Sequence, residues 1–260
     1  MTTDTVQASR RLPQGELIAM LAFLFATVAF SMDAMLPALP EIAAQLTPDD
    51  VNRAQLILTS FMAGMGLGTL FAGPVSDAIG RKPAMAIGFA IYLAASAVAL
   101  FVNSLELLLA ARFAQGLGAA APRIVGTALV RDLYSGREMA RITSFIMTVF
   151  MIVPALAPSI GQGFIWLGGW HAVFGGFVLF ALIGWLWFSL RQAETLPPEA
   201  RFASVESVQS YVDGVLSLPA VRAAWPHAGT VRVRPRRGAT AAHFERESAT
   251  IAVPEDRSRW

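Results

Sequence analysis

The stretch GPVSDAIGRKP, residues 73–83, places a carboxylate, a guanidinium and an ammonium in a short segment between two apolar runs. The run before it covers residues 56–72, and the run after it covers residues 84–102. A helix needs about 20 apolar residues to cross a hydrocarbon core about 30 Å thick. Both runs are close to that length, so the pattern predicts two membrane-spanning helices joined by a charged turn.

The composition extends this prediction to most of the chain. Hydrophobic residues make up 55% and charged residues 15% of the 260 residues, and the mean hydropathy is +0.54. A soluble domain has about 25% charged residues. Six segments are long and apolar enough to cross a membrane, at residues 16–36, 53–73, 83–102, 105–130, 141–166 and 171–190. We therefore predict an all-α membrane protein with a six-helix transmembrane bundle at 16–190.

Other function classes lack support in the sequence. The chain has no cysteine, which excludes a disulfide framework and a thiolate metal site. We find no metalloprotease, nucleophile-elbow, P-loop or paired-carboxylate motif, so we expect no enzyme activity, no cofactor and no metal. The segment GLGAAA, residues 116–121, lies within a predicted helix, where small residues favour close packing over nucleotide binding.

The distribution of basic residues predicts the orientation in the membrane. If the N-terminus is cytoplasmic, the segments outside the bilayer on that side carry nine basic residues, and those on the other side carry only Arg53. The nine are Arg10, Arg11, Arg81, Lys82, Arg131, Arg137, Arg141, Arg191 and Arg201. This bias follows the positive-inside rule. The protein is then located in the cytoplasmic, or inner, membrane. Residues 1–15 form a cytoplasmic tail, and residues 73–83 form a cytoplasmic turn.

The turn has a spacing that a simple topology anchor does not need: Gly73, Asp77, Gly80, Arg81 and Lys82. Glycines allow two helix ends to approach closely. Asp77 lies just before the third span, where a carboxylate can accept hydrogen bonds from free amides at the positive helix end. Arg81 is within reach of a partner on a neighbouring helix. The alternative is that Arg81 and Lys82 only anchor the topology.

These five residues match the pattern G-x-x-x-D-x-x-G-R-K, and in this the chain resembles the major facilitator superfamily. The resemblance implies a transporter in which this loop between spans two and three joins a charge network. In that family the network stabilises the outward-facing state and controls alternating access. The five residues are therefore predicted to form a gating loop.

The fourth predicted span contains LLLAARFAQGLGAAAPR, residues 107–123. Arg112 lies about 10 Å along the helix from Leu105, near the middle of the bilayer. A charge there costs at least about 2.5–3.5 kcal/mol, so it must face a polar cavity, a carboxylate or free carbonyl groups. Arg112, Gln115, Gly116 and Gly118 match the family pattern R-x-x-Q-G-x-G. The resemblance implies proton coupling for Arg112 and a place in the substrate cavity or the helix packing for the other three. The alternative is that Arg112 only caps carbonyl groups between helices.

The first span contains SMDAMLPALP, residues 31–40, with Asp33 about 24 Å along the helix from Leu17. Pro37 and Pro40 are expected to end this span. The segment resembles the drug:proton antiporter branch of the family, close to the Bcr/CflA group. Asp33 is then the predicted proton carrier, with Arg112 as its partner or modulator. The alternative is an interfacial carboxylate that only caps the helix end.

The fifth span matches the antiporter pattern only in part. The segment VPALAPSIGQ, residues 153–162, keeps Pro158 and Gly161, where the family has further glycines at Val153, Ala157 and Gln162. We assign Pro158 and Gly161 to the cavity or its packing. Pro154 and Pro158 are expected to bend the helix.

The resemblance covers about residues 12–200, which corresponds to one six-helix half, a three-plus-three inverted repeat. A complete member has twelve spans and binds its substrate between two halves. The predicted function is proton-coupled efflux of small amphipathic compounds or drugs by alternating access, with substrate, protons and lipid as partners and no nucleic acid. The alternative is a non-transporting membrane fragment, or a half-transporter that needs a second bundle.

The remaining residues differ in character from the bundle. Residues 191–217 are predicted to begin a cytoplasmic linker. Residues 218–260 carry eight arginines and no apolar run long enough to span a membrane, which predicts disorder. Three interpretations are open for this tail: a segment that binds nucleic acid or lipid, a solvated linker, or translation in a shifted frame. We favour a frameshift near codon 216, which translation of the following DNA in the other two frames tests.

Overall fold

The computed structural model describes residues 12–196, and these residues form helices without any strand. The elements are α2 (Gln14–Asp33), η1 (Leu36–Ala38), α3 (Leu39–Leu46), η2 (Val51–Gln55), α4 (Leu56–Ile79), α5 (Arg81–Ala99), α6 (Leu105–Leu133), α7 (Gly136–Phe150) and α8 (Ile152–Arg191). The all-α prediction is confirmed for this part of the chain. The predicted tail at 218–260, most of the linker at 191–217 and most of the tail at 1–15 lie outside the described residues.

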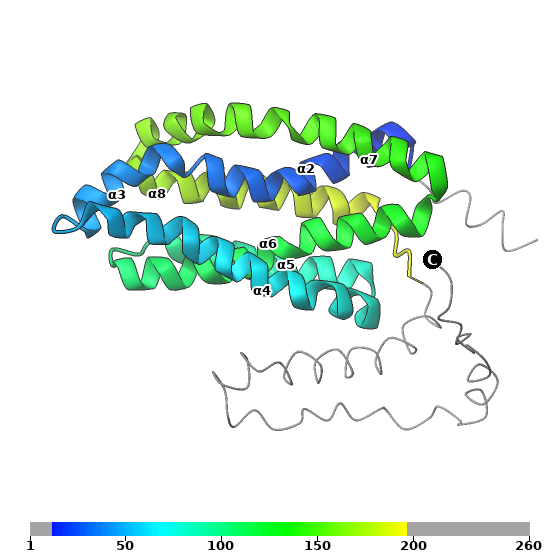
Figure 1. The fold of residues 1–260 in the computed structure, drawn as a ribbon, viewed down its shortest axis with the longest axis horizontal. Coiled ribbons are helices and arrows are strands. Elements are labelled where there is room, and N and C mark those ends of the chain that lie inside the picture. The colour runs from blue at the N-terminus through cyan, green and yellow to red at the C-terminus, as the bar shows by residue number, and fades with distance from the viewer. Residues whose placement is uncertain (1–11, 197–260) are drawn as a thin grey trace, which may run out of the picture.

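The long helices lie side by side along one axis of the molecule (Figure 1). Four helical stretches within residues 12–196 are long and apolar enough to span a membrane: Gln14–Leu46, Val51–Ile79, Arg81–Ala99 and Gly136–Arg191. The last stretch contains two of the predicted spans, because α8 has non-helical backbone at Gly168 and Gly169. The predicted fourth span forms α6, which is 29 residues long and carries Arg112 and Arg123.

Proline and glycine decide where the helices break. The expectation that Pro37 and Pro40 end the first span is wrong. The helix α2 already ends at Asp33, and the chain then continues past both prolines through η1 and α3. Pro37 and Pro40 occupy the first turns of these two short helices, where a missing N–H is tolerated. The break between α7 and α8 falls at Met151, because Pro154 cannot donate to the carbonyl of Phe150 four residues earlier.

Glycines bring α4 and α6 into backbone contact. A Cβ added at Gly64 of α4 would overlap the carbonyl group of Phe113 in α6, and one added at Gly68 would lie 2.9 Å from the Ala120 Cβ. In lipid, helices associate through such close packing, since no hydrophobic driving force acts between them. These small residues therefore set the distance between the two helices.

Aromatic rings pack α2 against α8. Phe23 and Phe30 of α2 stack on Phe180 of α8, with ring centroids 4.1 and 4.7 Å apart. At one end of the pair, Arg191 donates two hydrogen bonds to the Glu16 carboxylate, at 2.6 and 2.8 Å. The ends of α2 and α8 that carry Glu16 and Arg191 are at the right in Figure 1. We call this the Arg191 end of the bundle.

Candidate functional site

The turn between α4 and α5 consists of Gly80 alone, because α4 ends at Ile79 and α5 begins at Arg81. Gly80 has φ 106° and ψ 159°, a conformation that residues with a Cβ resist. The charged turn is therefore shorter than the predicted 73–83, and Gly73 and Asp77 lie inside α4. A Cβ at Gly73 would meet only ordinary contact, 3.8 Å from Ile124.

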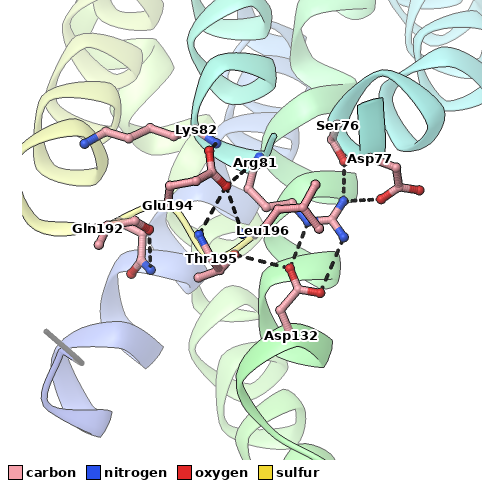
Figure 2. A network of polar contacts seen from close by, with 10 residues as sticks. Ser76, Asp77, Arg81, Lys82, Asp132, Gln192, Glu194, Thr195 and Leu196 are labelled. Atoms are coloured by element: carbon pink, nitrogen blue, oxygen red, sulfur yellow. Dashed lines mark hydrogen bonds and ion pairs between the residues drawn. The ribbon is translucent and has the colours of Figure 1, made fainter. Parts of the chain in front are cut away.

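Arg81 is the centre of a polar network that joins three helices (Figure 2). Its side chain is 8% exposed and forms an ion pair with Asp77 from the last turns of α4. Its Nε donates to Asp132 Oδ2 of α6 at 2.9 Å, and Nη1 donates to Ser76 Oγ at 2.6 Å. The predicted partner on a neighbouring helix is thus Asp132.

A carboxylate that we did not single out from the sequence, Glu194, lies at the N-terminus of α5. It accepts hydrogen bonds from the backbone N–H groups of Arg81 at 2.9 Å and Lys82 at 3.0 Å. We expected Asp77 to occupy this position, and that expectation is wrong, because Asp77 faces the guanidinium from α4. In the sequence, Gly80 was the residue that could have indicated a distant acceptor. A glycine cannot cap a helix with its side chain, so the first amides of α5 need another acceptor.

The segment after α8 is tied to the network at a second point. Thr195 donates from its hydroxyl to Asp132 Oδ2 at 3.2 Å, while the Lys82 ammonium points away from the carboxylates in Figure 2. Lys82 thus contributes its backbone N–H to these contacts, as the anchor interpretation of its side chain allows. We call Ser76, Asp77, Arg81, Asp132, Glu194 and Thr195 the Arg81 network.

Glu194→Gln is expected to loosen the segment after α8, because an amide replaces the charged acceptor at the positive end of α5. Cleavage by trypsin after Arg191 should become about tenfold faster, which corresponds to the loss of a charge-assisted hydrogen bond. The matched control is Glu106→Gln, since the Glu106 side chain is 77% exposed and 3.9 Å from Arg53. Equal cleavage rates in both variants would show that Glu194 does not hold the segment.

A polar cleft of about 500 Å³ opens beside the Arg81 network, between the Arg191 ends of α4 and α6. Asp77, Arg81 and Asp132 line it together with Arg123 and Arg131 of α6. The network therefore borders an open space that a further polar segment can enter.

Arg112 is fully buried in the middle of the helices, with 0% exposure. Its Nη2 donates to the backbone carbonyl of Ser31 in α2 at 3.0 Å, and its guanidinium carbon lies 4.6 Å from the centre of the Phe61 ring. Its Nε has no hydrogen-bond partner, and no carboxylate contacts it among the described residues. Of the three predicted surroundings for this charge, the structure shows a carbonyl group, supplemented by aromatic faces.

Gln115 fixes the orientation of Arg112. Its side-chain oxygen accepts from Arg112 Nη1 at 2.6 Å, and its side-chain nitrogen donates to Ser96 Oγ of α5 at 2.7 Å. Because each end of the amide has its own partner, the residue cannot rotate without losing both bonds. Gln115 is thus a support for Arg112, which the sequence pattern alone did not specify.

Asp33 is half-buried at the last position of α2, two residues after Ser31. Its carboxylate has no hydrogen bond or ion pair with any residue from 12 to 196, so of the two roles predicted for Arg112, partner or modulator of Asp33, the structure does not show the direct pairing. Arg112 instead binds the α2 backbone close to Asp33. The structure therefore brings the two residues to the same segment without pairing them.

The remaining predicted positions contribute to helix packing. A Cβ at Gly116 would overlap the backbone of Phe61 in α4, and one at Gly118 would lie 2.6 Å from the Tyr92 nitrogen in α5. Gly161 contacts the backbone of Ala34 in the same way, and Pro158 lies inside α8. Of the two roles predicted for these residues, the geometry of Gly116, Gly118 and Gly161 supports packing.

Comparison with known families agrees with this arrangement. The family model described as Major Facilitator Superfamily matches residues 21–242. The chain belongs to this superfamily. Superfamily membership and the apolar helices make it a multi-pass membrane protein of a carrier family whose members handle small-molecule substrates. The family that the sequence resembles is thereby confirmed.

The relatives include proteins named for drug resistance. The chain is 40% identical over 147 residues to a "Bicyclomycin resistance protein homolog" of Haemophilus influenzae, covering 56% of this chain and 36% of that protein. It is 32% identical over 184 residues to "Multidrug resistance protein MdtL" of Shigella dysenteriae, covering 70% of this chain and 47% of that protein. The chain spans about half, or less, of the length of these curated relatives.

The fold is also similar to solved transporters. The proton:xylose symporter XylE superposes with a TM-score of 0.63 at 11% identity, over 81% of this chain and 51% of that chain. This likeness concerns the fold alone.

Proposed function

We propose that this chain forms the N-terminal half of a proton-coupled exporter of small amphipathic compounds in the inner membrane. The proposal includes six membrane crossings, in which α6 crosses once, α7 crosses together with the first part of α8, and the second part of α8 crosses last. A second six-helix half completes the substrate cavity, and the exporter works by alternating access. The names of the drug-resistance relatives support export of drug-like compounds. The alternative is a fragment that does not transport by itself.

The observation that carries the proposal is the position of Arg112 beside the Asp33 segment. A buried cation without a carboxylate partner is costly in a membrane and marks a functional position. We propose that Asp33 binds and releases the coupled proton and that Arg112 responds to its charge. When Asp33 loses its proton, the attraction between the two groups favours a different position of α2, which links proton release to helix movement.

The Arg81 network supports a gating role at the Arg191 end. It contains two carboxylates on one guanidinium and a third on the start of α5, so opening this end requires several charge-assisted bonds to break. We propose that the second half makes contact at the open cleft beside it. We propose that this end faces the cytoplasm, as the distribution of basic residues predicts.

Single cysteines test this orientation, because the chain contains no cysteine of its own. Ser76 is buried and is a poor reporter, whereas Glu138 at the Arg191 end and Asn103 at the opposite end are exposed. We expect a membrane-impermeant maleimide added to intact cells to label Asn103→Cys and to leave Glu138→Cys unmodified until the cells are opened. The reverse labelling pattern would place the Arg81 network outside and remove its proposed role.

Reconstitution into liposomes tests export. We expect that liposomes with the chain alone do not move ethidium against its gradient when a proton gradient is applied. Liposomes that also contain the C-terminal half of a drug-resistance relative should export it. Export by neither preparation, with both halves correctly inserted, would support the non-transporting alternative. Export by the chain alone would show that a second half is not needed.

A further inference from the structure

A buried hydroxyl pair joins α5 to α2 at the level of Arg112. The Tyr92 hydroxyl is hydrogen-bonded to Ser31 Oγ, and these residues are 1% and 0% exposed. Ser31 Oγ also bonds the Thr27 carbonyl at 2.6 Å. A serine hydroxyl has one proton, which the carbonyl bond uses, so Tyr92 is the donor in the pair.

The same tyrosine is connected to Arg112 from the other side. Ser96, one turn further along α5, donates to the Tyr92 carbonyl at 2.7 Å and accepts from Gln115. Gln115 in turn accepts from Arg112, and Arg112 donates to the Ser31 carbonyl. The result is a closed ring of contacts through α2, α5 and α6 that contains Arg112, Gln115, Ser96, Tyr92 and Ser31.

This ring matters because Arg112 has few other partners. Its Nε has none, and its Nη2 relies on a backbone carbonyl that belongs to another helix. A buried donor that loses its acceptor incurs the full cost of its desolvation. The position of Ser31 therefore decides whether the Arg112 guanidinium stays hydrogen-bonded to α2. The Tyr92 hydroxyl connects Ser31 to α5.

We propose that Tyr92 is a positioning residue. Its hydroxyl holds Ser31, and with it the α2 carbonyl that binds Arg112, so that the buried cation stays beside the Asp33 segment. The consequence for transport rests on the proposed function. The effect on Arg112 itself does not, and it is measured separately.

The first measurement follows Arg112 directly in the purified chain, labelled with ¹⁵N-arginine in lipid nanodiscs. The Arg112 guanidinium signals are identified by their loss in Arg112→Lys. In Tyr92→Phe we expect the guanidinium protons of Arg112 to exchange with solvent about tenfold faster, because the local contact opens more often. Ser31→Ala should have the same effect, and the double variant should add little to either.

Tyr134→Phe is the matched control, since Tyr134 is half-buried and its hydroxyl has no hydrogen bond to any residue from 12 to 196. It should leave Arg112 exchange unchanged. Unchanged exchange in a folded Tyr92→Phe overturns the proposal. If Tyr92→Phe does not fold, Ser31→Ala decides, and normal exchange in that variant overturns the proposal equally.

The second measurement is export by the chain combined with a second half. Tyr92→Phe should lower the maximal rate at least fivefold and change the half-saturating substrate concentration less than twofold. If Arg112 in Tyr92→Phe exchanges as slowly as in the wild type, the positioning role is overturned, whether the maximal export rate is lost or normal. If the wild-type pair does not export, the proposed function fails, while the exchange measurement still decides the role of Tyr92.

Discussion

Arg112→Met is expected to reduce proton-driven export to the level of empty liposomes while leaving the bundle at least as stable as the wild type. The buried guanidinium has one carbonyl, one amide and aromatic rings as partners, and an unpaired Nε. Replacing a buried ion pair by apolar side chains of similar volume is often neutral or stabilises by about 1–4 kcal/mol, and we expect the same direction for this buried charge. If Arg112 serves transport, its replacement therefore lowers export while it leaves the stability of the bundle unchanged or higher.

Export is measured with both halves in liposomes, and stability by thermal unfolding of the chain in detergent. Arg53→Met is the control, because the Arg53 side chain is 52% exposed and should change neither quantity. A strong loss of stability in Arg112→Met would mean that Arg112 mainly holds helices together through the α2 carbonyl. Export at the wild-type rate would exclude Arg112 from proton coupling.

The largest loss of stability is expected from Gly64→Ala. An added methyl group at Gly64 overlaps the Phe113 carbonyl of α6, so the two helices must separate. Overpacking of this kind costs about 1–3 kcal/mol, and backbone contact leaves no side chain that can move aside. Thermal unfolding in detergent should show a clear decrease in the midpoint temperature.

Gly66→Ala is the matched control, with the same substitution on the same helix. Nothing lies within 4 Å of a Cβ at Gly66, so the change should stabilise α4 by about 0.5–1 kcal/mol through its higher helix propensity. Gly64→Ala is thus expected to lower the midpoint temperature, and Gly66→Ala to raise it. Equal midpoints would mean that the Gly64 contact with α6 does not limit the stability of the bundle.

The helical class and the membrane location follow from local features of the chain. Apolar runs of membrane-spanning length permit only helices with satisfied backbone groups, or closed barrels, and the runs are too long for barrel strands. The break before Pro154 and the turn at Gly80 follow from the covalent restrictions on these two residue types. The spacing of the charged turn was equally sufficient to predict the superfamily.

The partners of the charged residues depended on how the helices pack. The sequence by itself determined that Arg81 and Arg112 need partners, because an isolated charge in or near lipid is costly. Only the tertiary structure decided that Arg81 binds Asp132, that Glu194 takes the place expected for Asp77, and that Arg112 binds a carbonyl of α2 instead of Asp33. The reason is physical: a sequence specifies which groups must be satisfied, whereas the rotation and separation of packed helices select which of the available acceptors comes within hydrogen-bond distance.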